Sequence, residues 1–237
     1  ATPRSAMKLM EIFEEAGLTA GVLNLVTGPG GQVGTAVVER PDVKGISFTG
    51  STEIGTELYS ESAKRLKKVQ AEMGGKNAVI VLSDADMDKA MNGIVQGAFG
   101  STGQRCTATS RVIGEEDVYD RFMTDLIERT SKLIIGDGLD ASMDIAPLAS
   151  QNQKDKVLEY IGIGTEEGAE LAFGGRNMTG GEFDEGYYVE PAVFTGVTPD
   201  MRIAQEEIFG PVLTVFKAKD LKEAIGIANS VEFGLSS

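Results

Sequence analysis

Apolar residues recur along the chain at two alternating periods, and this alternation predicts an α/β fold. Helical spacing over 3–16 is followed by a strand-like run at 21–26. Further helices are expected at 35–40, 51–64, 84–100, 118–134, 151–168 and 220–230, and further strands at 44–50, 68–74, 76–82, 110–114, 169–175, 187–197 and 211–218. Strands that alternate with helices in this way are typical of a parallel sheet covered by helices.

The pattern is broken most clearly at Gly74 and Gly75, where two glycines separate two expected strands. We therefore expect a first domain at 1–73 and a second domain at 74–237. A glycine-rich surface loop is expected at 174–186.

Charge and composition exclude several classes of function. The formal net charge is −14, so the field of the protein repels a polyanion, and nucleic acid is not an expected partner. The longest apolar runs fall well short of the ~18 residues that cross a bilayer, so no membrane segment is expected. A single cysteine cannot form an internal disulfide, which indicates a reducing, cytoplasmic environment.

Cys106 is the only cysteine in a chain that has no histidine. The absence of histidine excludes Cys-His and Ser-His-Asp hydrolases and the usual zinc sites, and no metal site is expected. A lone cysteine is often a small buried core residue. The neighbours of Cys106, in STGQRCTATS, are polar throughout, which favours a reactive thiol whose negative charge is stabilised by backbone N–H groups.

Glu72 is the acidic residue best placed to act as a base in place of histidine. It lies at the end of an expected strand, immediately before Met73 and the two glycines. Side chains at the carboxyl ends of parallel strands are exposed in a crevice, where a carboxylate can act on a proton. The alternative is an ordinary acid in solvent at the end of a strand.

Two glycine-rich segments indicate a bound dinucleotide. The weaker is GPGGQVG at 28–34, whose spacing differs from that of the dinucleotide fingerprint. In FTGSTEIG at 48–55, Gly50 and Ser51 form a tight turn between a strand and a helix, where free N–H groups bind phosphate. No ATP-binding Walker motif is present, because Asn77 follows Lys76 where the motif needs serine or threonine.

The order of four segments resembles that of the aldehyde dehydrogenase superfamily. These are FTGSTEIG at 48–55, EMGGKNAVIV at 72–81, GSTGQRCTATSRV at 100–112 and EEIFGPVLTV at 206–215. The resemblance implies oxidation of an aldehyde to a carboxylic acid with NAD or NADP. It also implies that 1–73 is the C-terminal part of a Rossmann-type cofactor domain and that 74–237 is a catalytic domain truncated at its C-terminus.

The same resemblance assigns roles to residues. Cys106 matches the nucleophile that forms a thiohemiacetal and then a thioester, and Glu72 matches the base that activates water to hydrolyse the thioester. Gly30 and Ile54 match the positions around the adenosine of the cofactor, and Gly50 and Ser51 match the turn near its pyrophosphate. Glu207 and Phe209 match the positions at the nicotinamide ribose and ring.

Several residues of the family's pattern are absent from this chain. The residues that grip the adenosine ribose, and the asparagine that completes the oxyanion hole, lie in the family before the position at which this chain begins. Loss of one oxyanion donor removes about 3–4 kcal/mol of transition-state stabilisation. We therefore expect an internal fragment that is impaired on its own, from a full-length enzyme that is a homodimer or homotetramer.

The sequence is compatible with two other functions. A relative could pass the acyl group to coenzyme A or phosphate, although the presence of Glu72 favours hydrolysis. A binding or structural protein could reuse the scaffold, in which case Cys106 would be buried and unreactive. Among aldehydes, the cysteine segment most resembles that of enzymes acting on semialdehydes such as α-ketoglutaric or succinic semialdehyde, with Arg105 or Arg111 as a contact for the substrate carboxylate.

Overall fold

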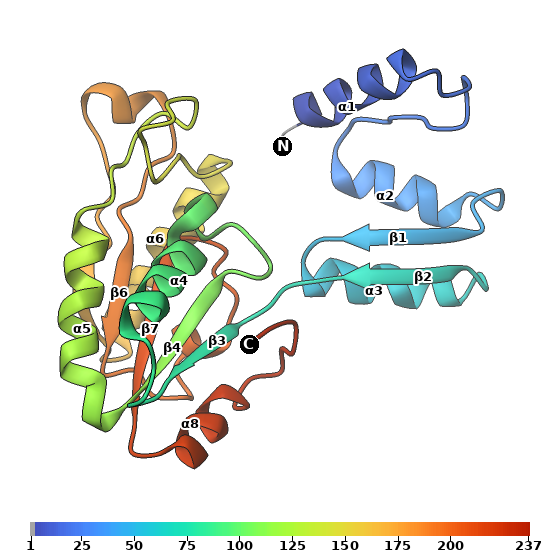
Figure 1. Cartoon of the computed structure of the whole chain (residues 1–237). Helices are drawn as coiled ribbons and strands as arrows, with labels where there is room; N and C mark the ends of the chain where they lie inside the picture. The colour runs from blue at the N-terminus through green and yellow to red at the C-terminus, as the bar shows by residue number, and fades with distance from the viewer. Residues whose placement is uncertain (1–2) are drawn as a thin grey trace. The chain divides into compact units, whose positions relative to one another are not determined.

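The computed structural model describes residues 3–237, which form two compact units, each with its own sheet (Figure 1). The first unit ends at Met73, and the second runs from Gly74 to Ser237. Both units combine parallel strands with helices, so the expected α/β class is confirmed.

The first unit contains a parallel pair of strands, β1 (Gly45–Thr49) and β2 (Lys68–Glu72). Register pairs Gly45 with Lys68 and Thr49 with Glu72, so both strands end at the same edge. Its helices are α1 (Pro3–Glu15), α2 (Gly30–Glu39) and α3 (Thr52–Ala63).

The strand expected at 21–26 is wrong, because these residues form turns and irregular backbone. Val22 and Val26 are 69% and 71% exposed, and within residues 3–237 the segment pairs with no other strand. Alternation of apolar residues is not sufficient for a strand, because backbone N–H and C=O groups also need a partner.

The second unit is built on a five-stranded sheet of order β3-β4-β7-β6-β5. All neighbours are parallel except β5 and β6, so the wholly parallel sheet that we expected is corrected at one edge. The strands are β3 (Asn77–Val81), β4 (Thr109–Glu115), β5 (Glu170–Gly174), β6 (Ala192–Thr195) and β7 (Val212–Ala218). The helices are α4 (Met87–Phe99), α5 (Glu116–Ser131), α6 (Gln151–Glu166), α7 (Arg202–Gln205) and α8 (Leu221–Ala228), with 3₁₀ turns η1 (Gly100–Gly103) and η2 (Gly181–Glu185).

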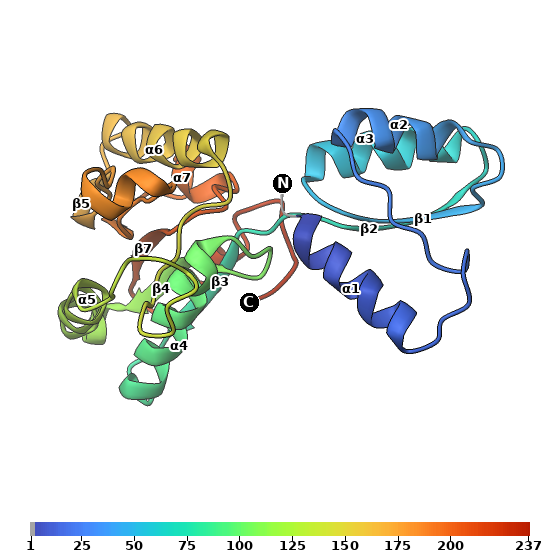
Figure 2. The ribbon, with the colours of Figure 1, turned by 90° about the horizontal axis from the view of Figure 1, so that it is seen from above.

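Helices cover both faces of this sheet, because its strands carry apolar side chains on both faces. Figure 2 shows α4 and α5 on one side and α6 and α7 on the other. Phe99 and Phe122 belong to the core under α4 and α5, whereas Val157 and Phe194 belong to the core under α6 and α7. The sheet therefore packs against a buried core on each of its two faces.

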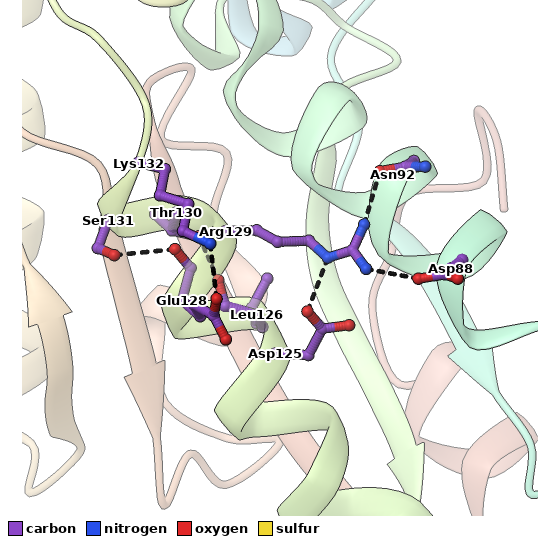
Figure 3. A network of polar contacts seen from close by, with 9 residues as sticks. All are labelled: Asp88, Asn92, Asp125, Leu126, Glu128, Arg129, Thr130, Ser131 and Lys132. Carbon is purple, nitrogen blue, oxygen red and sulfur yellow. Dashed lines mark hydrogen bonds and ion pairs between the residues drawn. The ribbon is translucent and has the colours of Figure 1, made fainter.

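Arg129 links α5 to α4 through hydrogen bonds (Figure 3). Helix α4 leads into residues 100–108, which we call the cysteine loop. The Arg129 guanidinium donates to Asp125 at 2.7 Å within α5, and to Asp88 at 2.7 Å and Asn92 at 2.8 Å on α4. Hydrogen bonding to Asp125 is the main cause that raises the pKa of Arg129 above its ordinary value. The contacts link the two helices through one side chain.

Candidate active site

The loop that leads to Cys106 has an unusual backbone. Ser101, Thr102 and Gly103 all have positive φ, at 53°, 57° and 66°. Two residues with a Cβ in this region are strained, and such strain concentrates at functional sites. The conformation is held by the buried Thr102, whose hydroxyl donates to the carbonyl of Ala146 at 2.8 Å.

Cys106 is a free, half-buried cysteine immediately beyond this loop. It is not part of either buried apolar cluster. The alternative that Cys106 is an ordinary core residue is therefore not favoured, because a reactive thiol must be reached by its partner.

Gly74 and Gly75, at the start of the second unit, lie between the cysteine loop and a second loop formed by residues 206–209. The N–H of Gly75 donates to the Glu207 carboxylate at 3.1 Å. A Cβ on Gly75 would lie 2.7 Å from the carbonyl oxygen of Cys106, and one on Gly74 would lie 2.4 Å from the Glu207 carboxylate. The Glu207 carboxylate can move, but the Cys106 main chain cannot easily do so, so the approach at Gly75 requires glycine. Gly75 thus lies beside both the Cys106 carbonyl and the Glu207 carboxylate.

The second loop, residues 206–209, is held by side chains that bind four successive carbonyl groups. Lys76 donates to the first at 2.7 Å and Lys156 to the second at 2.9 Å. Gln153 donates to the third and fourth at 2.9 and 3.0 Å. These bonds stabilise the positive φ of 60° at Phe209, whose side chain remains 36% exposed.

The two adjacent glutamates of this loop have different environments. The Glu206 carboxylate accepts from the Arg202 guanidinium at 3.0 Å and from the Tyr160 hydroxyl, and the bond from Arg202 is the main cause that lowers the pKa of Glu206. Glu206 therefore fixes the loop to α6 and α7. Glu207 instead directs its carboxylate to Gly75.

A small pocket lies where these parts of the second unit meet. Its lining includes Gly75, Gly103, Glu207 and Phe209. Of the residues predicted to form the site, Glu207 and Phe209 line this pocket, and Cys106 does not, although Arg105 and Ala108 on either side of it do.

The other predicted site residues lie in the first unit. The N–H of Gly50 donates to the Glu72 carbonyl at 3.1 Å, so the expected phosphate turn and the expected base share one edge of the sheet. Ser51 caps α3 by accepting from the N–H of Ile54, and both Ile54 and Glu72 are exposed. Gly30 is the first residue of α2, with open space where a Cβ would be.

Both arginines that were expected to contact the substrate donate to main-chain carbonyl groups in this structure. Arg111 is buried and donates to the carbonyls of Lys76, Ile227 and Ala228, so all its nitrogen atoms are used within the fold. Arg105 donates to the carbonyls of Gln96 and Gly97 near the C-terminal end of α4. Buried carbonyl groups at the end of α8 and beside β3 thus use the donors of Arg111, which does not favour it as a contact for a substrate carboxylate.

Sequence reasoning missed Lys76, Asn77, Gln153 and Lys156, which hold the two loops in place. The signal available was the polar pair Lys76-Asn77 directly before an apolar strand. Both residues are buried, and buried lysine and asparagine need several partners.

Lys76 is a buried lysine whose ammonium group donates to the main-chain carbonyl of Glu206. Loss of hydration is the main cause that lowers its pKa to about 7; the positive charges of Arg111 and Lys156 contribute, and Glu207 and Glu206 partly oppose the shift. The unfolded chain, with an ordinary lysine pKa of 10.5, therefore binds more protons than the folded chain between these two values. Stability must then rise with pH in that window.

We expect the free energy of unfolding to rise by about 1 kcal/mol per pH unit between about pH 7 and pH 9 because of Lys76. Urea unfolding at several pH values measures this slope. Lys76→Met should remove it, whereas Lys222→Met, which replaces an exposed lysine, should retain it. Equal slopes in the wild-type chain and in Lys76→Met would contradict the prediction.

Residues 3–237 contain neither a candidate metal cluster nor a candidate membrane-spanning helix. Across this range, no cluster of three histidine, cysteine, aspartate or glutamate side chains is arranged to hold a metal ion. None of the helices described there has the length and apolar character needed to cross a membrane.

Comparison with known proteins gives consistent matches over the whole chain. The model of the aldehyde dehydrogenase family matches residues 1–237. The α-ketoglutaric semialdehyde dehydrogenase of Bacillus subtilis is 49% identical over 236 residues, which cover 100% of this chain and 48% of that protein. The 1-pyrroline-5-carboxylate dehydrogenase of Geobacillus kaustophilus is 46% identical, covering 100% of this chain and 46% of the relative.

Solved structures agree with these relatives. Betaine aldehyde dehydrogenase of Staphylococcus aureus in complex with NAD⁺ matches with a TM-score of 0.95 at 35% identity, covering 99% of this chain and 46% of that chain. An NAD-dependent aldehyde dehydrogenase of Sinorhizobium meliloti matches with a TM-score of 0.95 at 41% identity, with the same coverage. The chain spans about half the length of the relatives that it matches. On the match of the family model to residues 1–237, the chain belongs to the aldehyde dehydrogenase family.

Proposed function

We propose that this chain supplies the catalytic residues of an NAD(P)-dependent aldehyde dehydrogenase. The observation that carries the proposal is the position of Gly75, which contacts both the Cys106 carbonyl and the Glu207 carboxylate. One glycine thereby links the candidate nucleophile to the loop proposed to bind the nicotinamide. Family membership supports the same assignment.

Cys106 is the proposed nucleophile. Its thiolate adds to the carbonyl carbon of the aldehyde, and the resulting alkoxide is stabilised by backbone N–H groups of the cysteine loop. Bound NAD or NADP supplies the acceptor for the hydride that leaves this carbon, and the carbon becomes a thioester of Cys106. Glu72 then takes a proton from water as the water attacks the thioester, which releases the carboxylic acid and the thiol.

The residues proposed for the cofactor suit the chemistry of its parts. The amino end of α3, next to Gly50 and Ser51, attracts phosphate, because N–H groups and the helix dipole point there. The exposed side chain of Ile54 and the open space at Gly30 suit an adenosine. Glu207 accepts hydrogen bonds from ribose hydroxyl groups, and the exposed ring of Phe209 packs against a nicotinamide.

Several further features belong to the proposal. Residues 1–73 form part of the cofactor domain, and residues 74–237 form part of the catalytic domain. The enzyme acts in the cytoplasm, where its one thiol in this region stays reduced, and assembles as a homodimer or homotetramer. The preferred substrate is a semialdehyde, because several similar proteins are semialdehyde dehydrogenases by name.

A panel of aldehydes tests the function and the substrate class together. The full-length protein should reduce NAD or NADP, measured by absorbance, with higher kcat/KM for semialdehydes than for unsubstituted aliphatic aldehydes of equal length. Equal turnover of both kinds would remove the semialdehyde assignment. Product formation that requires added coenzyme A or phosphate would replace hydrolysis by acyl transfer.

A further inference from the structure

Asn77, the first residue of β3, makes three hydrogen bonds through its side chain to main-chain groups near the candidate site. Its side chain is buried, and its amide nitrogen donates to the carbonyl of Cys106 at 2.7 Å and to that of Ala108 at 2.9 Å. Its amide oxygen accepts from the backbone N–H of Ser236 at 3.1 Å. These three partners require the amide in this orientation, because only the nitrogen donates and only the oxygen accepts.

The pairing of β3 with β4 is irregular at Asn77, so a side chain binds carbonyl groups that the strand ladder does not. The register between β3 and β4 shifts after Asn77, which pairs with Thr109, while the next residue pairs with Arg111. A bulge of this kind interrupts the regular ladder and redirects the chain entering the strand. The carbonyls of Cys106 and Ala108 lie just before that irregular point, outside the ladder, and Asn77 binds both.

The Cys106 carbonyl is held from two sides. Asn77 donates to its oxygen, and the missing side chain of Gly75 leaves the space that the same oxygen occupies. Because a peptide group is planar, fixing this oxygen restricts rotation about the bond between the α-carbon and the carbonyl carbon of Cys106. The direction of the Cα–Cβ bond that carries the thiol is restricted in turn.

We propose that Asn77 is a positioning residue for Cys106. Through its amide it fixes the peptide that follows the nucleophile, and it ties the cysteine loop to β3 and to the C-terminal segment at Ser236. The inference rests on the proposed function in that it takes Cys106 as the nucleophile. The proposed role of Asn77 is to align the thiol and not to bind the substrate or cofactor. Its loss should therefore lower kcat and leave KM nearly unchanged.

Two measurements on Asn77→Ala and Asn77→Asp test the proposal. Asn77→Asp keeps an oxygen for Ser236 but has no N–H donor for the two carbonyls. In both variants, amide hydrogen exchange in residues 104–108 should become about tenfold faster than in the wild type, because two hydrogen bonds are lost. In the full-length protein, kcat should fall about tenfold while both KM values stay within about twofold.

Asn152→Ala, at an exposed site on α6, is the matched control and should leave exchange and kcat unchanged. Unchanged exchange in residues 104–108 of the Asn77 variants would overturn the proposal without reference to activity. Faster exchange with unchanged kcat would also overturn it, because the alignment would then not matter. Absence of aldehyde-dependent cofactor reduction in the wild type would instead reject the proposed function.

Discussion

Replacing Glu72 by glutamine is expected to leave one rapid burst of reduced cofactor per active site and to slow the following steady state by about a hundredfold or more. The reason is the order of events in the proposed mechanism. Hydride transfer precedes the step in which Glu72 accepts a proton from water, so the thioester of Cys106 forms but is not hydrolysed. Rapid mixing of the full-length protein with aldehyde and cofactor measures the burst and the steady rate separately.

Two further variants complete this experiment. Cys106→Ser should show neither burst nor turnover, because the weakly acidic serine hydroxyl replaces the thiol. Glu57→Gln removes an exposed carboxylate from α3 and should behave as the wild type. A burst lost together with turnover in Glu72→Gln would place Glu72 before hydride transfer, and full turnover would remove its role as the base.

Replacing Gly103 by alanine is expected to lower the free energy of unfolding of the second unit by about 2–4 kcal/mol. The residue has a φ of +66°, and an added Cβ would lie 2.2 Å from the carbonyl oxygen of Gly210. Either the cysteine loop or the segment that ends at Gly210 must move to relieve the contact. Urea unfolding monitored by circular dichroism measures the loss.

Gly181→Ala separates the two causes of this loss. Gly181 has a similar φ of +61°, but no atom lies within 4 Å of the Cβ position. Its replacement should cost only the backbone strain, about 1 kcal/mol. Equal losses in the two variants would mean that the approach of Gly103 to Gly210 contributes nothing.

Most helices and strands could be predicted from the sequence, because their apolar periods match the faces that they bury. Periodicity failed at 21–26, where the pattern is present but no partner strand pairs with the backbone. It also failed at α7, which is too short for a helical period to be detected, and at the antiparallel edge between β5 and β6. The direction of a strand depends on the path of the connecting chain, and local pattern does not record that path.

The residues of the candidate site could be proposed from the sequence, but the hydrogen bonds that hold them could not. Cys106 and Glu72 are conspicuous because the chain has no histidine, and the family resemblance assigned Glu207 and Phe209. The bonds from Asn77 and Lys76 are made to backbone carbonyls far along the chain. A carbonyl group is present at every residue, so sequence carries no mark of which one a side chain binds.

The four held carbonyls of residues 206–209 have a consequence for protein engineering. Because Lys76, just before β3, and Gln153 and Lys156 on α6 bind the main chain, the path of this loop depends little on the Phe209 side chain. Libraries of side chains can therefore be exchanged at position 209 to vary the proposed contact with the nicotinamide, while the main chain of the loop keeps its path.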